Sequence, residues 1–165
     1  MPRGSVVERI PARRADVFRL MHDYKRRLEW DTLLQSAVLT EGAEAGLHAR
    51  AVCKGRFYLG SIEIKSEYVS FREPDVAAVK MMNRAPFFDS FAATIRHRDL
   101  GDGWSHVEYI YQFAARPAWL RWLLHPVMHA LLRWETWRRL RSLRLFFGKE
   151  WQASSLPYDG LAARR

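Results

Sequence analysis

Cysteine and long apolar runs are both scarce in this sequence of 165 residues. Cys53 is the single cysteine, so the chain cannot form an internal disulfide. The stretch from Trp119 to Trp134 is rich in leucine and tryptophan. It is interrupted by two arginines, two histidines and a proline, and stays short of the roughly 18 to 20 apolar residues that cross a bilayer. The first residues also lack the apolar centre of a secretory signal. We therefore expect a cytoplasmic protein that does not span a membrane.

Several signatures of catalytic and cofactor sites are missing as well. The sequence contains no glycine-rich phosphate loop, no serine elbow and no pair of carboxylates at a useful spacing. His125 and His129 have the four-residue spacing that lets two imidazoles share a metal, but Pro126 disturbs this turn and no third ligand is evident. Cys53 has no recognisable catalytic partner, which favours a buried, inert thiol. We expect neither a metal nor a cofactor.

The composition is that of a folded domain. Hydrophobic residues make up 48% of the chain, aromatic residues 13% and charged residues 27%. The sequence shows no internal repeat and no glycine- or serine-rich linker. This predicts one domain over residues 1–150, followed by a tail over 151–165.

The hydrophobic periodicity predicts an α+β protein. Apolar residues recur at helical spacing in two early segments and in one long late segment, and they alternate with polar residues elsewhere. Gly-Asp-Gly at 101–103 separates two alternating runs, as in a hairpin. The predicted strands are 5–10, 36–42, 46–55, 60–71, 76–83, 89–100 and 104–115, and the predicted helices are 12–24, 25–34 and 117–147.

The long final helix carries two apolar stripes that are rotated from each other. The first stripe consists of Leu120, Leu123, Leu124 and Val127 and continues in Leu131 and Trp134, and the second consists of Leu132, Thr136, Leu140, Leu143 and Phe147. Two stripes predict two packing partners. Pro126 lacks an amide proton, which predicts a kink or a new helix start near His125.

A Trp-Asp pair, Trp30 and Asp31, stands where the second helical segment gives way to a strand. Asp16, Val17 and Phe18 begin the first helix with the letters "DVF". This ordered set, over about residues 5–147, resembles the START-like superfamily, also called SRPBCC or the polyketide cyclase/dehydrase and birch-pollen-allergen-like group. The resemblance implies the helix-grip fold, a curved antiparallel sheet of about seven strands around a long C-terminal helix. We interpret Trp30 as a plug in the corner between helix and sheet, and Asp31 as a residue that orients the turn.

The same resemblance implies a cavity between the sheet and the final helix. Alternation places small and apolar residues on the inner face, together with tyrosines that would bring hydroxyls to an apolar wall. The alternative is a filled core with tyrosines at its rim. The predicted ligand-binding residues are Leu47, Ala49, Ala51, Ile62, Ile64, Tyr68, Phe91, Ala93, Ile95, Tyr109, Tyr111, Phe113, Leu124, Met128 and Leu131.

Such a cavity predicts binding or transport of a hydrophobic small molecule such as a lipid, a quinone or a polyketide-like compound. The alternative is a cyclase or dehydrase that uses the same cavity, with His97, Tyr109 or Tyr111 moving a proton. His97 is in phase with the inward residues of its strand, yet the sequence places no charged acid-base pair in the cavity, which favours binding over catalysis. A third hypothesis is an accessory protein whose tryptophan-rich helix buries a partner.

The charge of the chain is strongly positive, at +9, and unevenly placed. Between Arg116 and Lys149 the only acid is Glu135. A solvated helix face would explain this pattern, and so would peripheral contact with an anionic membrane through Arg138, Arg141 and Arg144. No nucleic-acid reading motif is present, so we expect no nucleic-acid partner. The sequence does not indicate an oligomeric state.

Overall fold

The computed structural model describes residues 1–42, 44–56 and 60–155. Within these residues, seven strands form one antiparallel sheet in the order β1-β7-β6-β5-β4-β3-β2. In chain order the elements are β1 (Arg3–Ile10), α1 (Arg14–His22), α2 (Arg27–Trp30), β2 (Leu34–Leu39), η1 (Thr40–Gly42), β3 (Arg50–Gly55), β4 (Glu63–Arg72), β5 (Val76–Met81), β6 (Phe88–Gly101), β7 (Trp104–Ala115), η3 (Ala118–Leu120) and α3 (Arg121–Ser155). The predicted order of strand, two helices, six strands and long helix is confirmed.

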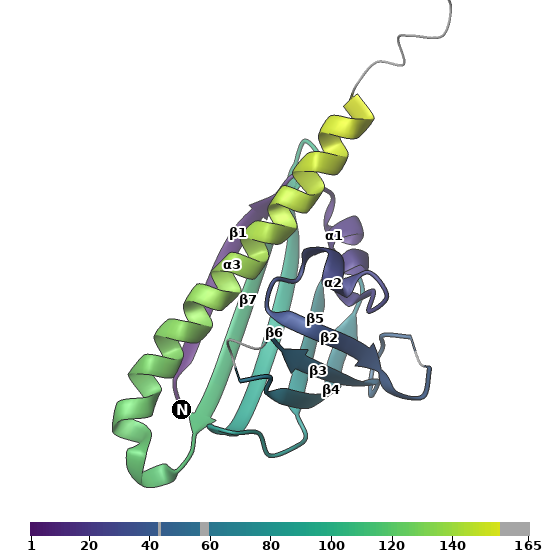
Figure 1. The fold of residues 1–165 in the computed structure, drawn as a ribbon. Coiled ribbons are helices and arrows are strands. Elements are labelled where there is room, and N and C mark those ends of the chain that lie inside the picture. The colour runs from purple at the N-terminus through teal and green to yellow at the C-terminus, as the bar shows by residue number, and fades with distance from the viewer. Residues whose placement is uncertain (43, 57–59, 156–165) are drawn as a thin grey trace, which may run out of the picture.

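The sheet curls into a half-barrel, and α3 lies along its concave side next to β1 and β7 (Figure 1). Neighbouring strands twist relative to one another, and bulges add to the local bend. Register shifts of this kind interrupt the pairing of β2 with β3, of β4 with β5 and of β6 with β7. The curl gives the sheet an inner face, on which the candidate site lies.

Several predicted boundaries differ from the structure, in three elements by four residues or more. The second helical segment contains only the four-residue helix α2. β3 begins at Arg50 and not at residue 46, because His48 has a left-handed backbone with φ of 65° that ends the extended conformation. α3 continues to Ser155, beyond the predicted end at 147 and into the segment predicted as a tail.

Of the two alternatives predicted near His125, a kink or a new helix start, the new start is wrong and the kink stays a prediction. α3 begins at Arg121 and includes Pro126 within its helical span. The proline lies only five residues from the helix start, so the hydrogen bond that it removes belongs to the first turns. No helix among the described residues is long and apolar enough to cross a membrane.

The two stripes of α3 have different environments. Thr136, Leu140, Leu143 and Phe147 of the second stripe are buried, and Leu132 is partly buried against the same core. Most of the first stripe, namely Leu123, Val127, Leu131 and Trp134, is exposed. α3 therefore packs onto the sheet and the early helices with its second stripe.

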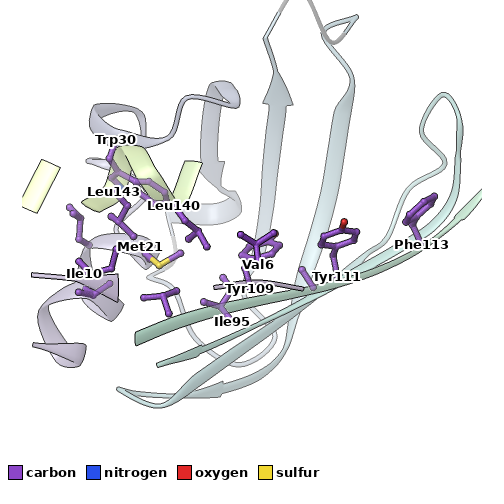
Figure 2. Packing of buried hydrophobic residues seen from close by; sticks show 14 of the residues in the cluster. Val6, Ile10, Met21, Trp30, Ile95, Tyr109, Tyr111, Phe113, Leu140 and Leu143 are labelled. Carbon is purple, nitrogen blue, oxygen red and sulfur yellow. The ribbon is translucent and has the colours of Figure 1, made fainter. Parts of the chain in front are cut away.

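Trp30 closes the corner between α2 and the sheet, as predicted. Its indole is almost fully buried, and Figure 2 shows it next to Leu140 and Leu143 of α3 and Met21 of α1. The backbone amide of Leu33 donates a hydrogen bond of 3.1 Å to Asp31 Oδ1, so the carboxylate also orients the turn as expected.

Candidate functional site

The inner face of the sheet is built from cross-strand rows of side chains. Directly paired residues in antiparallel strands point to the same face. Tyr68 pairs with Val79, Val79 with Ala93, and Ala93 with Tyr111, which makes one row across β4, β5, β6 and β7. Phe91 pairs with Phe113 in the next inward row toward α3's first turns. Figure 2 shows Tyr109, Tyr111 and Phe113 standing in sequence along this inner surface.

The residues predicted to line the cavity fall into three groups. The first group is buried: Ala51, Tyr68, Ala93, Ile95, Tyr109, Tyr111, Phe113 and Met128. The second group keeps part of its surface accessible: Ala49, Ile62, Ile64, Phe91 and Leu124. Their inward positions agree with the alternation, while their contact with a ligand remains a prediction.

The third group, Leu47 and Leu131, does not face inward, and the prediction for these two residues is wrong. Leu47 is 56% exposed because it lies in the turn before β3, where the conformation of His48 breaks the alternation. Leu131 is 44% exposed because it belongs to the stripe of α3 that points away from the core.

The inner face is apolar and accessible at one end and closed at the other. Ile62 and Ile64 of the β4 side, Phe91 of β6 and Leu124 of α3 pack against the core yet remain partly exposed. At the opposite end, a hollow of about 170 Å³ between α1, α2, β7 and α3 is too narrow to hold a water molecule. Any ligand space on this face would therefore lie toward the first half of α3.

Two of the predicted catalytic candidates, Tyr109 and Tyr111, interact with α3. The Tyr111 hydroxyl donates a hydrogen bond of 3.3 Å to the backbone carbonyl of His129. The Arg139 guanidinium lies 5.5 Å from the centre of the Tyr109 ring. Burial raises the pKa of Tyr111 above its ordinary value, so its hydroxyl stays neutral at physiological pH. Both tyrosines thus help to hold the helix on the sheet.

His97 points inward, as the alternation predicted, and is only 2% exposed. Its ring lies 5.2 Å from that of Phe18, and neither ring nitrogen has a hydrogen-bond partner among the residues described. Burial lowers the pKa of His97 to about 4, so the imidazole is neutral at pH 7. The ring is enclosed by α1 and not open to the predicted cavity.

A second buried histidine, His22, forms a chain of polar groups that the sequence did not reveal. His22 Nδ1 lies 2.8 Å from the Tyr68 hydroxyl, which lies 3.3 Å from the Tyr24 hydroxyl. Burial and, to a lesser degree, the Arg27 charge hold the pKa of His22 well below its usual value, and burial raises that of Tyr68 well above its own. All three groups are neutral at pH 7, and each lies within hydrogen-bonding distance of the next.

This polar chain borders a groove of about 650 Å³ between the end of α1 and β2 with η1. Phe18, Tyr24 and Phe71 supply aromatic walls, and His22 contributes to the same lining. His22 Nε2 is buried and has no hydrogen-bond partner within the described part of the chain. The groove thus combines aromatic walls with one neutral imidazole, whose Nε2 is itself buried.

A buried ion network lies behind the inner face, where α2 meets α3. The Asp31 carboxylate accepts hydrogen bonds from Arg27 at 3.0 Å and from Arg139 at 2.7 Å. Burial by itself raises the pKa of Asp31, but Arg139 and Arg27 outweigh it, so the net shift is downward. The Arg27 guanidinium also lies 4.8 Å from the centre of the Trp30 ring. The network is enclosed and joins elements, which suits a structural role.

Comparison with known families agrees with this architecture. A family model described as "Polyketide cyclase / dehydrase and lipid transport" matches residues 1–145. The chain belongs to this family. No curated protein matches the sequence.

Solved structures of several other proteins share the fold of this chain. The Zhui aromatase/cyclase from Streptomyces sp. R1128 superposes with a TM-score of 0.79 at 11% identity, over 93% of this chain and 98% of that one. XoxI from Bacillus cereus has a TM-score of 0.72 at 18% identity, over 91% and 98%. A START superfamily protein from Mycobacterium smegmatis has a TM-score of 0.62 at 10% identity, over 86% and 98%. The helix-grip fold is thereby confirmed, and the family model confirms the resemblance to the polyketide cyclase/dehydrase group.

Two hydrogen bonds that involve His125 and His129 attach the first turns of α3 to β7, which is a structural role. His125 Nε2 accepts a hydrogen bond of 3.3 Å from the amide of Ala115 at the end of β7, and the carbonyl of His129 accepts the Tyr111 hydroxyl. No group of three or more metal-binding side chains occurs in the ranges that the structure describes. Burial raises the pKa of the Cys53 thiol, which makes it a weak nucleophile.

Proposed function

We propose that this protein binds a hydrophobic small molecule, such as a lipid, a quinone or a polyketide-like aromatic, on the inner face of its sheet beneath the first half of α3. The observation that carries the proposal is the partial exposure of Ile62, Ile64, Phe91 and Leu124 on a surface whose floor is formed by buried aromatic residues. Covering such apolar side chains with a ligand gains roughly 25 cal/mol for each Å² removed from water. Membership in a family described by cyclase activity and lipid transport supports the same proposal.

The test is competitive binding of a neutral fluorescent probe, N-phenyl-1-naphthylamine, together with native mass spectrometry of gently purified protein. Ile64→Gln places an amide on the inner face of β4 and is expected to weaken probe binding by about tenfold. Val69→Gln is the matched control, because Val69 is an exposed aliphatic residue of the same strand. Equal binding by both variants, or no bound lipid-like mass and no binding by the unaltered protein, would refute the proposal.

The second candidate function is a cyclase or dehydrase reaction, and the observation that favours it is the chain of His22, Tyr68 and Tyr24 beside the groove. A neutral imidazole can accept a proton at one ring nitrogen while its other ring nitrogen keeps a hydrogen bond to a phenol. His22 lines the groove, whereas the predicted candidate His97 does not, so His22 is better placed for this role. With a poly-β-ketone substrate, Tyr68→Phe is expected to slow turnover at least tenfold while Tyr111→Phe retains it. Equal turnover by both variants would exclude this chain from the reaction.

A further inference from the structure

The exposed stripe of α3 is the second packing surface that its sequence predicts, and nothing within the described chain covers it. We define the outer stripe as Trp119, Leu123, Val127, Leu131 and Trp134. The last four are spaced by four, four and three residues on α3, which places them on one side of the helix. In Figure 1, α3 lies beside β1 and β7, and no labelled element lies over its outer side. Within the described chain, the outer stripe therefore lacks an intramolecular partner of the kind that the second stripe has.

Aromatic exposure is greatest at the start of the helix. Trp119 is 76% exposed and Trp122 is 77% exposed. Phe87 is also exposed, and it lies at the same end, because its carbonyl accepts a hydrogen bond of 3.0 Å from the amide of Arg116. Water-exposed indole rings of this kind are typical of surfaces that bind a membrane or another molecule.

The charges around the outer stripe are of one sign. From Arg121 to Lys149 the only acid is Glu135, which is just 2% exposed and lies 3.2 Å from Arg138. Asp89, beside the helix start, is paired with Arg121 at 2.9 Å. Arg133 and Arg141 are exposed close to the stripe. Between Arg121 and Lys149, the outer side of α3 thus presents apolar and cationic groups and no exposed carboxylate.

The combination of apolar and cationic groups indicates which kind of partner could cover the outer stripe. A second copy of the chain would carry the same net charge of +9 and would set the same cationic helix face against this one, so the two copies would repel each other. An anionic bilayer supplies both an apolar layer for tryptophan, leucine and valine and negative headgroups for arginine. We propose that the outer stripe of α3 docks on the surface of an anionic lipid membrane, with the helix lying in the plane of the interface.

The sequence predicted that the membrane contact would be made by Arg138, Arg141 and Arg144. The proposal assigns the main membrane contact to the outer stripe instead. Arg144 donates a hydrogen bond of 2.9 Å to Glu8 of β1, and Arg138 contacts the carbonyl of Thr32 at 3.3 Å. The Arg141 guanidinium lies 5.2 Å from the centre of the Trp137 ring. These arginines contribute positive charge, while the apolar contact comes from the stripe that precedes them.

The test is co-sedimentation of the full chain with vesicles of phosphatidylcholine alone and of phosphatidylcholine mixed with phosphatidylglycerol. We expect binding only to the mixed vesicles, weakened by added salt. Val127→Gln with Leu131→Gln is expected to lower the partition coefficient by about tenfold or more, since both side chains lose their apolar contact with lipid. Val7→Gln with Val69→Gln, two exposed residues of the sheet, is the matched control and is expected to bind like the unaltered protein.

Three outcomes would overturn the proposal: no binding to the mixed vesicles, equal binding by the stripe variant and the control, or a dimer in sedimentation velocity that the stripe variant abolishes. The last outcome would assign the stripe to a second copy of the chain. Thermal unfolding of both variants checks that they remain folded. The proposal is independent of the ligand site, because the stripe variant should bind N-phenyl-1-naphthylamine with unchanged affinity.

Discussion

Replacing Asp31 by asparagine removes a negative charge that lies between two buried arginines. The side chain of Asp31 is fully buried, and those of Arg27 and Arg139 are nearly so. Asparagine has almost the same volume and keeps an oxygen that can accept the Leu33 amide, so the substitution changes the charge and little else. The two guanidinium groups would then be close together in the protein interior without their shared carboxylate.

The expected cost is large. Removing one partner of a buried ion pair typically destabilises a protein by about 3–5 kcal/mol, because the remaining charge is left desolvated. For a chain of this size each kcal/mol lowers the melting temperature by about 2–4 °C, so Asp31→Asn should melt roughly 6–20 °C lower. Glu73→Gln is the control: Glu73 pairs with Arg19 at 3.0 Å on the surface, where such pairs contribute about 0–1 kcal/mol.

The pH dependence gives a second readout of the same network. The folded pKa of Asp31 lies below its ordinary value, so its contribution is fully present above the unfolded pKa of about 4 and is lost as the pH falls through the folded pKa. The difference in the free energy of unfolding between the unaltered protein and Asp31→Asn, measured by urea unfolding, should therefore become smaller below about pH 4. If Asp31→Asn were as stable as Glu73→Gln, the buried network would not support the corner as argued.

Two further predictions concern the inner face. Burial lowers the folded pKa of His97 to about 4, so the unfolded chain takes up a proton at this residue first as the pH falls below about 6.5. His97 should therefore contribute a loss of about 2 kcal/mol in the free energy of unfolding between pH 7 and pH 5. His97→Leu should remove that contribution in urea titrations, and an unchanged pH dependence would contradict the assignment. Gly4→Ala would place a methyl group 2.5 Å from the Tyr111 ring and hydroxyl and 2.9 Å from His129, so it should cost about 1–3 kcal/mol in thermal unfolding, whereas an unaffected variant would show that this packing is loose.

The order of elements could be predicted from the sequence because it depends on local periodicity. Apolar residues at helical or alternating spacing indicate which side of each segment is buried. The inward position of His97 followed from the same kind of pattern, whereas the Trp30 corner was implied by the family resemblance. The misplacement of Leu47 shows the limit, since one left-handed residue, His48, was enough to break an alternation that the letters suggested.

The partners of the buried polar groups could not be predicted in this way. Asp31 and Arg139 are 108 positions apart, and His22 and Tyr68 are 46 positions apart. His22 also lies off the apolar stripe of its helix, so no local signal indicated that it would be buried. Pairings of this kind depend on how the curled sheet brings distant segments together.

The sequence by itself determined the strands, the helices and the presence of two apolar stripes on the last helix, because each is a property of neighbouring residues. Only the tertiary structure decided which stripe packs on the sheet and which is left for another partner. The physical reason is that hydrophobicity records a tendency to leave water, whereas the identity of the covering surface depends on the shape and charge of groups that meet only after folding.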